Sequence, residues 1–181
     1  MASILKVNEI QHTGGTSALT VDSSGNVDFP QKVTTPNRVA FLAPAQNAAS
    51  RDISSFTIFP GSYYSTGVSN YFNNGNHWNT TTGKFIAPFD GLYYFSGQQR
   101  FDGYGGSNYV YLRLQLFDTD GSTVLRSLST SLWDGNFTYR CFTVDTLCNL
   151  TVGQQVGLGA MAVGDTTIGW DDGHFLGYHI G

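Results

Sequence analysis

The stretch YFNNGNHWNTTTGKFIAPFDGLYYFSG, residues 71–97, decides the fold of this chain. It contains the short apolar run Phe85 to Ala87, the turn Pro88 to Gly91 and a series of aromatic residues that ends at Phe95. Pro and Gly are typical of turns, and clustered Tyr and Phe favour half-buried strands. Residues 71–97 therefore predict two strands that meet at a tight turn.

The overall composition is that of an all-β protein. Aromatic residues make up 14% of the 181 residues, and charged residues make up only 12%. The charged share is about half of the roughly 25% found in ordinary globular domains. A surface with so few charges suits a subunit buried in an assembly, although a neutral isolated β-domain has the same composition.

The charge pattern argues against nucleic-acid and membrane partners. The formal net charge is -4, and the nine basic residues are scattered along the chain without forming a patch. No apolar run reaches the roughly 18 residues of a membrane span. The beginning of the chain lacks the charged and apolar regions of a secretory signal. We therefore expect assembly in a cytoplasm, where Cys141 and Cys148 stay free thiols.

Two regions of different character are predicted, residues 1–37 and residues 38–181. The first region contains short alternating segments that are too few to bury a core alone. We expect it to become ordered by docking on another protein or by winding with copies of itself. Its apolar residues are the expected anchor, namely Ile4, Leu5, Val7 and Ile10.

A strictly alternating strand is predicted in the second region, from Tyr109 to Phe117. One face of this strand should line the core, with Val110, Leu112, Leu114 and Leu116. The other face carries Tyr109, Tyr111, Arg113, Gln115 and Phe117, and is too aromatic for an ordinary solvated surface. We interpret that face as an interface between copies of the chain. Asp118 to Gly121 should then close a hairpin.

Nine residues around the opening stretch occur in a characteristic order: Phe72, Gly75, Trp78, Gly83, Phe85, Pro88, Gly91, Tyr93 and Phe95. This order resembles the signature of the globular head of complement component 1q, a family of trimeric jelly rolls related to tumour necrosis factor. The resemblance implies an all-β jelly-roll β-sandwich that forms a homotrimer. The aromatic outer face of the strand from Tyr109 to Phe117 then places Tyr109, Tyr111 and Phe117 at the expected trimer interface. Phe72, Phe85, Tyr93 and Phe95 are expected to fill the core and the three-fold interface.

A second resemblance concerns residues 1–37. The motif LKVNEIQHTGG, residues 5–15, is followed by a strand at Leu19 to Val21 and a turn at Asp22 to Gly25. This segment resembles the amino-terminal part of fibre and other structural proteins of aquatic tailed bacteriophages. It implies a virion protein, a surface fibre or spike knob anchored to other virion proteins and active in host attachment. A capsid decoration or head-fibre trimer and a soluble complement-like ligand-binding protein remain alternatives.

Candidate catalytic residues do not form a recognisable pattern. The four His are dispersed, and no G-x-S-x-G motif occurs. Asp118 and Asp120 lie in a turn, where Asp usually bonds to its own backbone. Their carboxylates could also bind calcium, and this weak alternative stays open. We therefore expect no enzyme and no cofactor.

The loops are rich in aromatic and amide side chains, which suit contacts with sugars or proteins. Tyr104 and Trp133 are the candidate contacts to a host surface glycan or protein, with burial in the core or the three-fold interface as the alternative.

Overall fold

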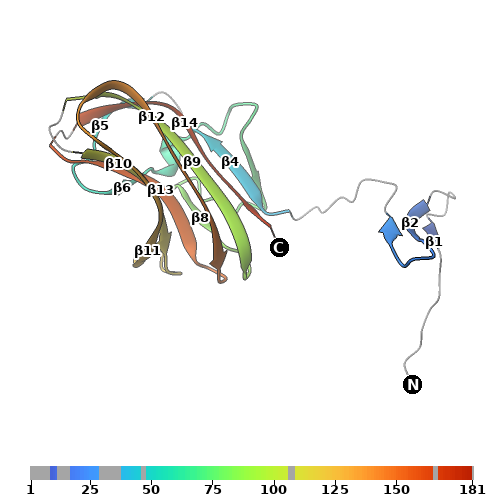
Figure 1. The fold of residues 1–181 in the computed structure, drawn as a ribbon. Helices are drawn as coiled ribbons and strands as arrows, with labels where there is room; N and C mark the ends of the chain where they lie inside the picture. Colours follow the sequence, from blue (N-terminus) through green and yellow to red (C-terminus); the bar gives the residue numbers. More distant parts are fainter. Residues whose placement is uncertain are drawn as a thin grey trace. The chain divides into compact units, whose positions relative to one another are not determined.

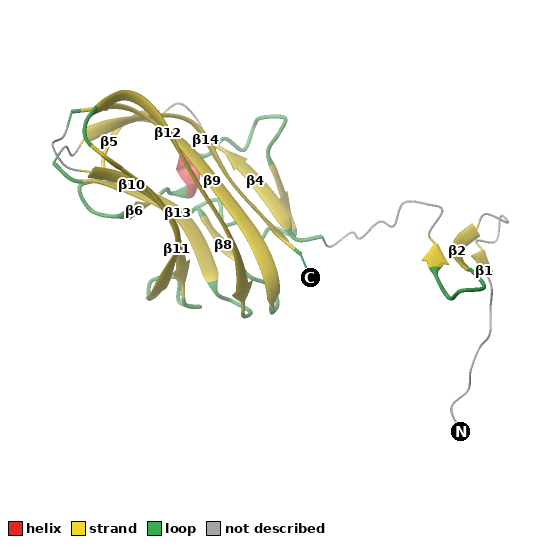
Figure 2. Cartoon of the chain, viewed as in Figure 1, coloured by secondary structure: helices red, strands yellow, loops and turns green. Residues whose placement is uncertain are grey.

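The computed structural model describes residues 9–11, 17–28, 38–45, 48–105, 109–164 and 167–180. The chain divides into two compact units, Met1–Pro36 and Asn37–Gly181. The described parts of both units contain strands, and the described residues also include a short 3-10 helix, Gly61–Tyr63 (Figure 2). Within these ranges, the structure has no helix with the length and apolar character needed to cross a membrane.

The first unit contains a small antiparallel sheet. Its strands are β1 (Glu9–Gln11), β2 (Ser17–Val21) and β3 (Val27–Asp28), in the order β1-β2-β3. The Asp22 carboxylate stabilises the turn between β2 and β3. It accepts hydrogen bonds from the backbone N–H groups of Ser24 and Asn26, at 2.8 and 2.9 Å. Ile10 and Val27 are exposed within the chain. The other expected anchor residues, Ile4, Leu5 and Val7, lie outside the described residues.

The second unit is a sandwich of two antiparallel sheets (Figure 1). One sheet has the order β11-β10-β13-β6, with β8 also paired to β13. Its strands are β6 (Thr57–Ile58), β8 (Lys84–Ile86), β10 (Tyr109–Phe117), β11 (Val124–Asp134) and β13 (Gln155–Ala162). This five-stranded sheet contains the predicted alternating strand.

The other sheet has the order β12-β9-β14-β4-β7, with β5 also paired to β14. Its strands are β4 (Ala40–Pro44), β5 (Ala48–Asp52), β7 (Phe72–Asn74), β9 (Gly91–Tyr104), β12 (Phe137–Leu150) and β14 (Thr167–His179). The predicted all-β sandwich is thus confirmed.

The core lies between the facing sides of the two sheets. The alternation of β10 places Val110, Leu112, Leu114 and Leu116 in this core, as the sequence predicts. Aromatic side chains fill much of the space between the sheets, where their edge-to-face contacts add to the apolar area that they bury. The ring centroids of Phe41 and Phe175, for example, lie 4.9 Å apart in an edge contact.

The close approach of aromatic rings to the backbone explains a glycine in β14. A Cβ atom added at Gly177 would lie 2.5 Å from a ring carbon of Phe95 and 2.7 Å from one of Phe41. Such distances are far below van der Waals contact, so the two rings pack directly on the β14 backbone.

The opening stretch, residues 71–97, is organised around Trp78. This side chain is buried, and its ring lies edge-on to Tyr64 with centroids 5.2 Å apart. The amide of Asn73 holds the loop, because it donates to Trp78 O at 2.8 Å and accepts from Trp78 N at 3.1 Å. Gly83 adopts φ +71°, which favours glycine, and a Cβ there would lie 2.0 Å from Phe59 O.

One of the four aromatic residues expected in the core or the three-fold interface lies on the surface of the single chain. Phe85, Tyr93 and Phe95 are fully buried as expected, but 42% of Phe72 is exposed. Phe72 lies on β7 at the edge of the six-stranded sheet, where it pairs with Leu42. The neighbours of Leu42 along β4, Phe41 and Ala43, point into the core, so Leu42 and Phe72 face outward.

Hydrogen bonds near the two ends of the second unit show where the chain enters and leaves it. His179 N donates to Val39 O at 3.0 Å, and Ile180 N donates to Leu92 O at 2.8 Å. The chain therefore enters and leaves this unit at one end, next to the beginning of β9 (Figure 1). We call the opposite end, where β9 finishes at Tyr104, the distal end. At ~3.3 Å per residue, the strand β9 spans roughly 43 Å.

Candidate interaction surfaces

The predicted interface on β10 is largely covered by the chain itself. Only 7% of Tyr111 and 5% of Phe117 are exposed, whereas Tyr109 is 38% exposed. The ring of Phe56 stacks on Tyr111 with centroids 5.9 Å apart, and Lys84 Nζ lies 4.0 Å from the centroid of Phe117. The expectation that all three rings are uncovered is therefore wrong for Tyr111 and Phe117. Their place in a trimer interface stays a prediction.

The outer face of the six-stranded sheet carries a different group of apolar side chains. Leu147 on β12 pairs with Tyr94 on β9, which pairs with Tyr178 on β14. The rings of Tyr94 and Tyr178 have centroids 5.3 Å apart, and 60% of Leu147 is exposed. We call this row and its outward neighbours the apolar patch, formed by Leu42, Phe72, Tyr94, Leu147, Leu176 and Tyr178.

The same outer face is charged toward the distal end. Arg100 on β9 forms ion pairs with Asp102 at 3.0 Å, with Asp172 at 3.3 Å and with Asp171. The pKa of Arg100 is raised, first by its hydrogen bond to Asp102 and then by the charges of all three carboxylates. Three carboxylates surround one guanidinium, so the cluster has an excess of negative charge.

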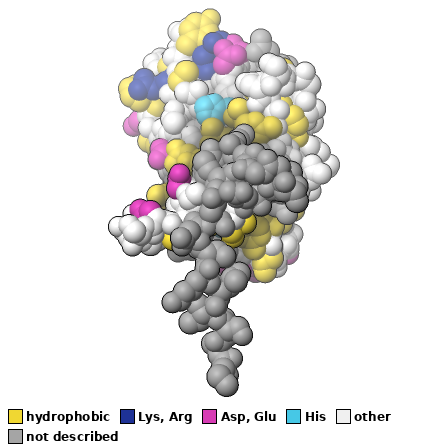
Figure 3. Space-filling view, turned by 90° about the vertical axis from the view of Figure 1, so that its right-hand side faces the viewer, with side chains coloured by type: hydrophobic (Ala, Val, Ile, Leu, Met, Phe, Trp, Pro, Cys, Tyr) yellow, Lys and Arg dark blue, Asp and Glu magenta, His cyan; other side chains and the backbone are white. Residues whose placement is uncertain are grey.

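Outside this cluster the head presents few charges. The face drawn in Figure 3 is mostly uncharged polar and hydrophobic surface, with few charged side chains. The low charged share of the sequence is thus visible on the surface as well.

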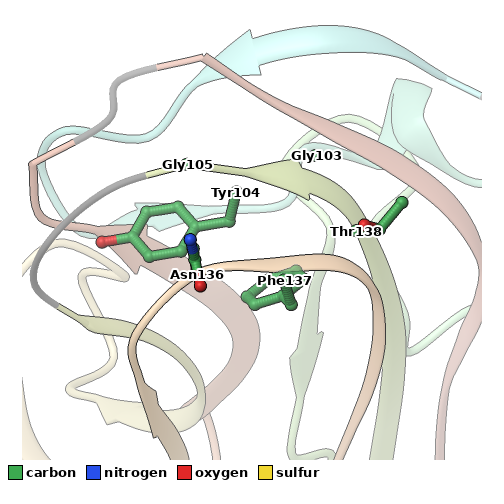
Figure 4. Close-up of a pocket in the computed structure, with 6 residues that line it drawn as sticks. All are labelled: Gly103, Tyr104, Gly105, Asn136, Phe137 and Thr138. Carbon is green, nitrogen blue, oxygen red and sulfur yellow. The ribbon is translucent and has the colours of Figure 1, made fainter.

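A hollow of about 400 Å³ lies at the distal end, between the end of β9 and the β11–β12 hairpin. It is lined by Gly103, Tyr104, Gly105, Asn136, Phe137 and Thr138 (Figure 4). The ring centroids of Tyr104 and Phe137 lie 5.5 Å apart. Tyr104 is only 1% exposed, and its hydroxyl donates to Val163 O. Tyr104 therefore supports the wall of the hollow from behind.

The second expected contact residue, Trp133, is not among the residues that line the hollow. Its ring is half-buried at the end of β11, and the guanidinium of Arg140 lies 3.1 Å from the ring centroid. Val110, the residue paired with Trp133, is a core residue, so Trp133 faces the interior of the sandwich. Trp133 therefore does not share the hollow with Tyr104.

The acidic hairpin forms the turn that the sequence predicts. Asp118 N donates to Thr123 O at 2.9 Å, and Gly121 N donates to Asp118 O at 3.0 Å. The pKa of Asp120 is well below its ordinary value, because its carboxylate accepts hydrogen bonds from Thr123 and from Ser122. Among the described residues, no group of three or more His, Cys, Asp or Glu is placed to hold a metal ion.

The two cysteines are free, as expected. Both lie on β12, where Cys141 is exposed and Cys148 is buried. Burial raises the pKa of the Cys148 thiol to about 11.

The family model of the C1q domain matches residues 68–178, which include β7 to β13 and most of β14. The chain belongs to the C1q domain family. No curated protein matches the chain. The family membership confirms the predicted jelly-roll fold, and the C1q domain is generally a ligand-binding or structural domain without enzymatic activity.

Sequence reasoning missed the surface residues of this C1q domain that lie on β12. Residues 139–149 alternate between exposed and covered positions, with Leu147 on the exposed side and Val144 and Cys148 on the core side. This alternation could have identified β12 as a strand, with the apolar Leu147 on its outer face. Nothing in the sequence indicates that Leu147 lies beside Tyr94 and Tyr178, because those partners come from distant segments.

Proposed function

We propose that this C1q domain is the trimeric head of a surface knob on the virion of a tailed phage. Residues 1–37 would attach the knob to other virion proteins, and the head would contribute to host attachment. The virion role rests on the resemblance of residues 5–25 to phage structural proteins. The exposed Ile10 and Val27 support docking of this segment, because a partner protein would cover them.

The apolar patch is the observation that carries the trimer. Leu147, Tyr94 and Tyr178 form a continuous row across three strands, and the single chain leaves this row partly uncovered. A partly exposed apolar row on the face of a sheet is typical of an interface between subunits. The C1q family consists of trimeric heads, as the sequence resemblance implies, so the expected occupant is another copy of the chain. This proposal replaces the β10 face as the expected interface, and the five-stranded sheet then faces solvent.

Sedimentation equilibrium of the purified full chain tests the trimer. We expect a single species with three times the mass of the chain at micromolar concentration. A stable monomer at that concentration would contradict the proposal.

Electron microscopy of particles labelled with an antibody against the head tests the virion role. We expect label at defined sites on the particle, and no label when residues 1–37 are deleted. A few dozen copies or fewer indicate a tail or vertex fibre, whereas hundreds of copies indicate a capsid decoration. Unlabelled particles would leave a soluble ligand-binding protein as the remaining interpretation.

A further inference from the structure

We propose that the distal hollow binds one uncharged sugar unit of a surface glycan. The proposal rests on the proposed function for its biological role and on the chemistry of the hollow for its ligand class. It assigns the contact to Asn136, Phe137 and Thr138, with Tyr104 as a positioning residue.

The aromatic wall of the hollow is fixed in place before any ligand arrives. Phe137 is half-buried, and its ring is flanked by Tyr104 at 5.5 Å and Phe142 at 6.1 Å between centroids. Tyr104 is itself held by the hydrogen bond to Val163 O. A rigid aromatic side chain loses little conformational entropy on binding, and its flat surface suits the C–H face of a pyranose ring.

The polar groups of the hollow are uncharged. Asn136 and Thr138 are exposed residues that flank Phe137 in the chain, and they offer an amide and a hydroxyl. Asn136 lies in the turn before β12, and Thr138 lies on β12 (Figure 4). An amide and a hydroxyl can each donate and accept, which matches sugar hydroxyls. None of the six lining residues is charged, so the hollow favours a neutral sugar over a phosphate or a uronic acid.

Glycines keep the hollow accessible. A Cβ atom added at Gly103 would have no heavy atom within 4 Å, so the space beside it is open. Gly103 adopts φ +75°, which disfavours any larger residue there. Gly135, at φ +99°, forms the tight turn that precedes Asn136. The backbone therefore presents Asn136 next to an opening that the side chains of the described residues do not fill.

The size of the hollow favours a small ligand over a protein. A volume of about 400 Å³ lies at the lower end of the usual range for small-molecule sites, roughly 300–1,000 Å³. A stable protein partner typically engages about 20–30 residues on each side, many more than line this hollow. One sugar unit at the end or side of a longer glycan fits these limits.

The position of the hollow agrees with a role in recognition. It lies at the distal end, roughly 43 Å along β9 from the end at which the chain enters the head. A head attached through residues 1–37 would thus present the hollow far from its point of entry.

Saturation-transfer NMR on the full chain tests the proposal with defined sugars. The probes are D-glucose, D-galactose, D-mannose and N-acetylglucosamine, with D-glucuronate as a charged comparison. We expect saturable binding of at least one neutral sugar. The exchange Asn136→Ala should raise its Kd about 3- to 10-fold, which corresponds to the loss of one neutral hydrogen bond. Asn70→Ala, an exposed turn residue outside the hollow, is the matched control and should leave the Kd unchanged.

Three outcomes would overturn the glycan site: no saturable binding of any neutral sugar, equal affinity in Asn136→Ala, or preferential binding of glucuronate. A second variant, Thr138→Ala, shows whether Asn136→Ala acts only by disturbing the turn, and it should weaken binding of the same sugar. These results are independent of the proposed function, because mass and virion labelling test that separately. A trimeric virion protein that binds no neutral sugar refutes only the glycan site.

Discussion

Replacing Leu147 by Asp is the sharpest test of the interface on the six-stranded sheet. The side chain is 60% exposed in the single chain, and full burial of a leucine contributes about 2 kcal/mol. Covering the exposed part in a trimer would then contribute ~1.2 kcal/mol per copy, or ~3.6 kcal/mol for three copies. Losing this contribution raises the trimer dissociation constant on the order of 400-fold. Three buried carboxylates would raise it further.

The matched control is Leu132→Asp. Leu132 is 57% exposed on β11 and pairs with Tyr111, so it tests the outer face of the other sheet with the same chemical change. Sedimentation equilibrium at several concentrations should show Leu147→Asp as monomer and Leu132→Asp as trimer. Circular dichroism should show an unchanged fold for both. A trimeric Leu147→Asp together with a monomeric Leu132→Asp would refute our reasoning and place the interface on the β10 face.

Three further predictions concern the single chain. Gly177→Ala should lower the free energy of unfolding by about 1–3 kcal/mol in urea denaturation, because its Cβ overlaps two core rings; Gly67→Ala, where a Cβ meets no atom within 4 Å, should change it little. Asp120→Ala should lower stability at neutral pH and reduce the loss of stability in acid. Hydrogen bonds lower the pKa of Asp120 in the folded state, and the bond from Thr123 has the largest effect. The contribution of Asp120 to stability is therefore present above the ordinary pKa of 3.8 and declines as the pH falls below it. An unchanged acid limb in pH-dependent melting would contradict this. Iodoacetamide should modify Cys141 alone in the folded protein, because Cys148 is buried. Mass spectrometry of peptides measures this, and modification of Cys148 before unfolding would contradict its burial.

The sequence predicts the core better than the surface, for a physical reason. The side-chain alternation of a strand is local, so Val110 and Leu112 could be assigned to the core from β10 alone. The cover over the outer face of β10 is not local. Phe56 and Lys84 come from other segments and cover Tyr111 and Phe117, so the residue pattern of β10 misidentified them as exposed.

The candidate sites also depend on contacts between distant segments, which the sequence does not reveal. Tyr104 could be recognised as part of a loop-rich end, but its burial depends on Val163 and Phe137, which lie far away in the chain. The apolar patch required the pairing of three strands that are distant in sequence. Phe72 was assigned to the core or the three-fold interface without a choice between them, and only the edge position of β7 places it on the outer face.

The long central strands have a mechanical consequence. The neighbouring strands β12, β9 and β14 contain 14, 14 and 13 residues. The chain enters the head through β4, which pairs antiparallel with β14 over five consecutive positions. Ladder hydrogen bonds run perpendicular to the strands. Tension between the entry point and the distal end therefore loads these bonds in shear, so that they must rupture together, and the head would resist unfolding when pulled in this direction.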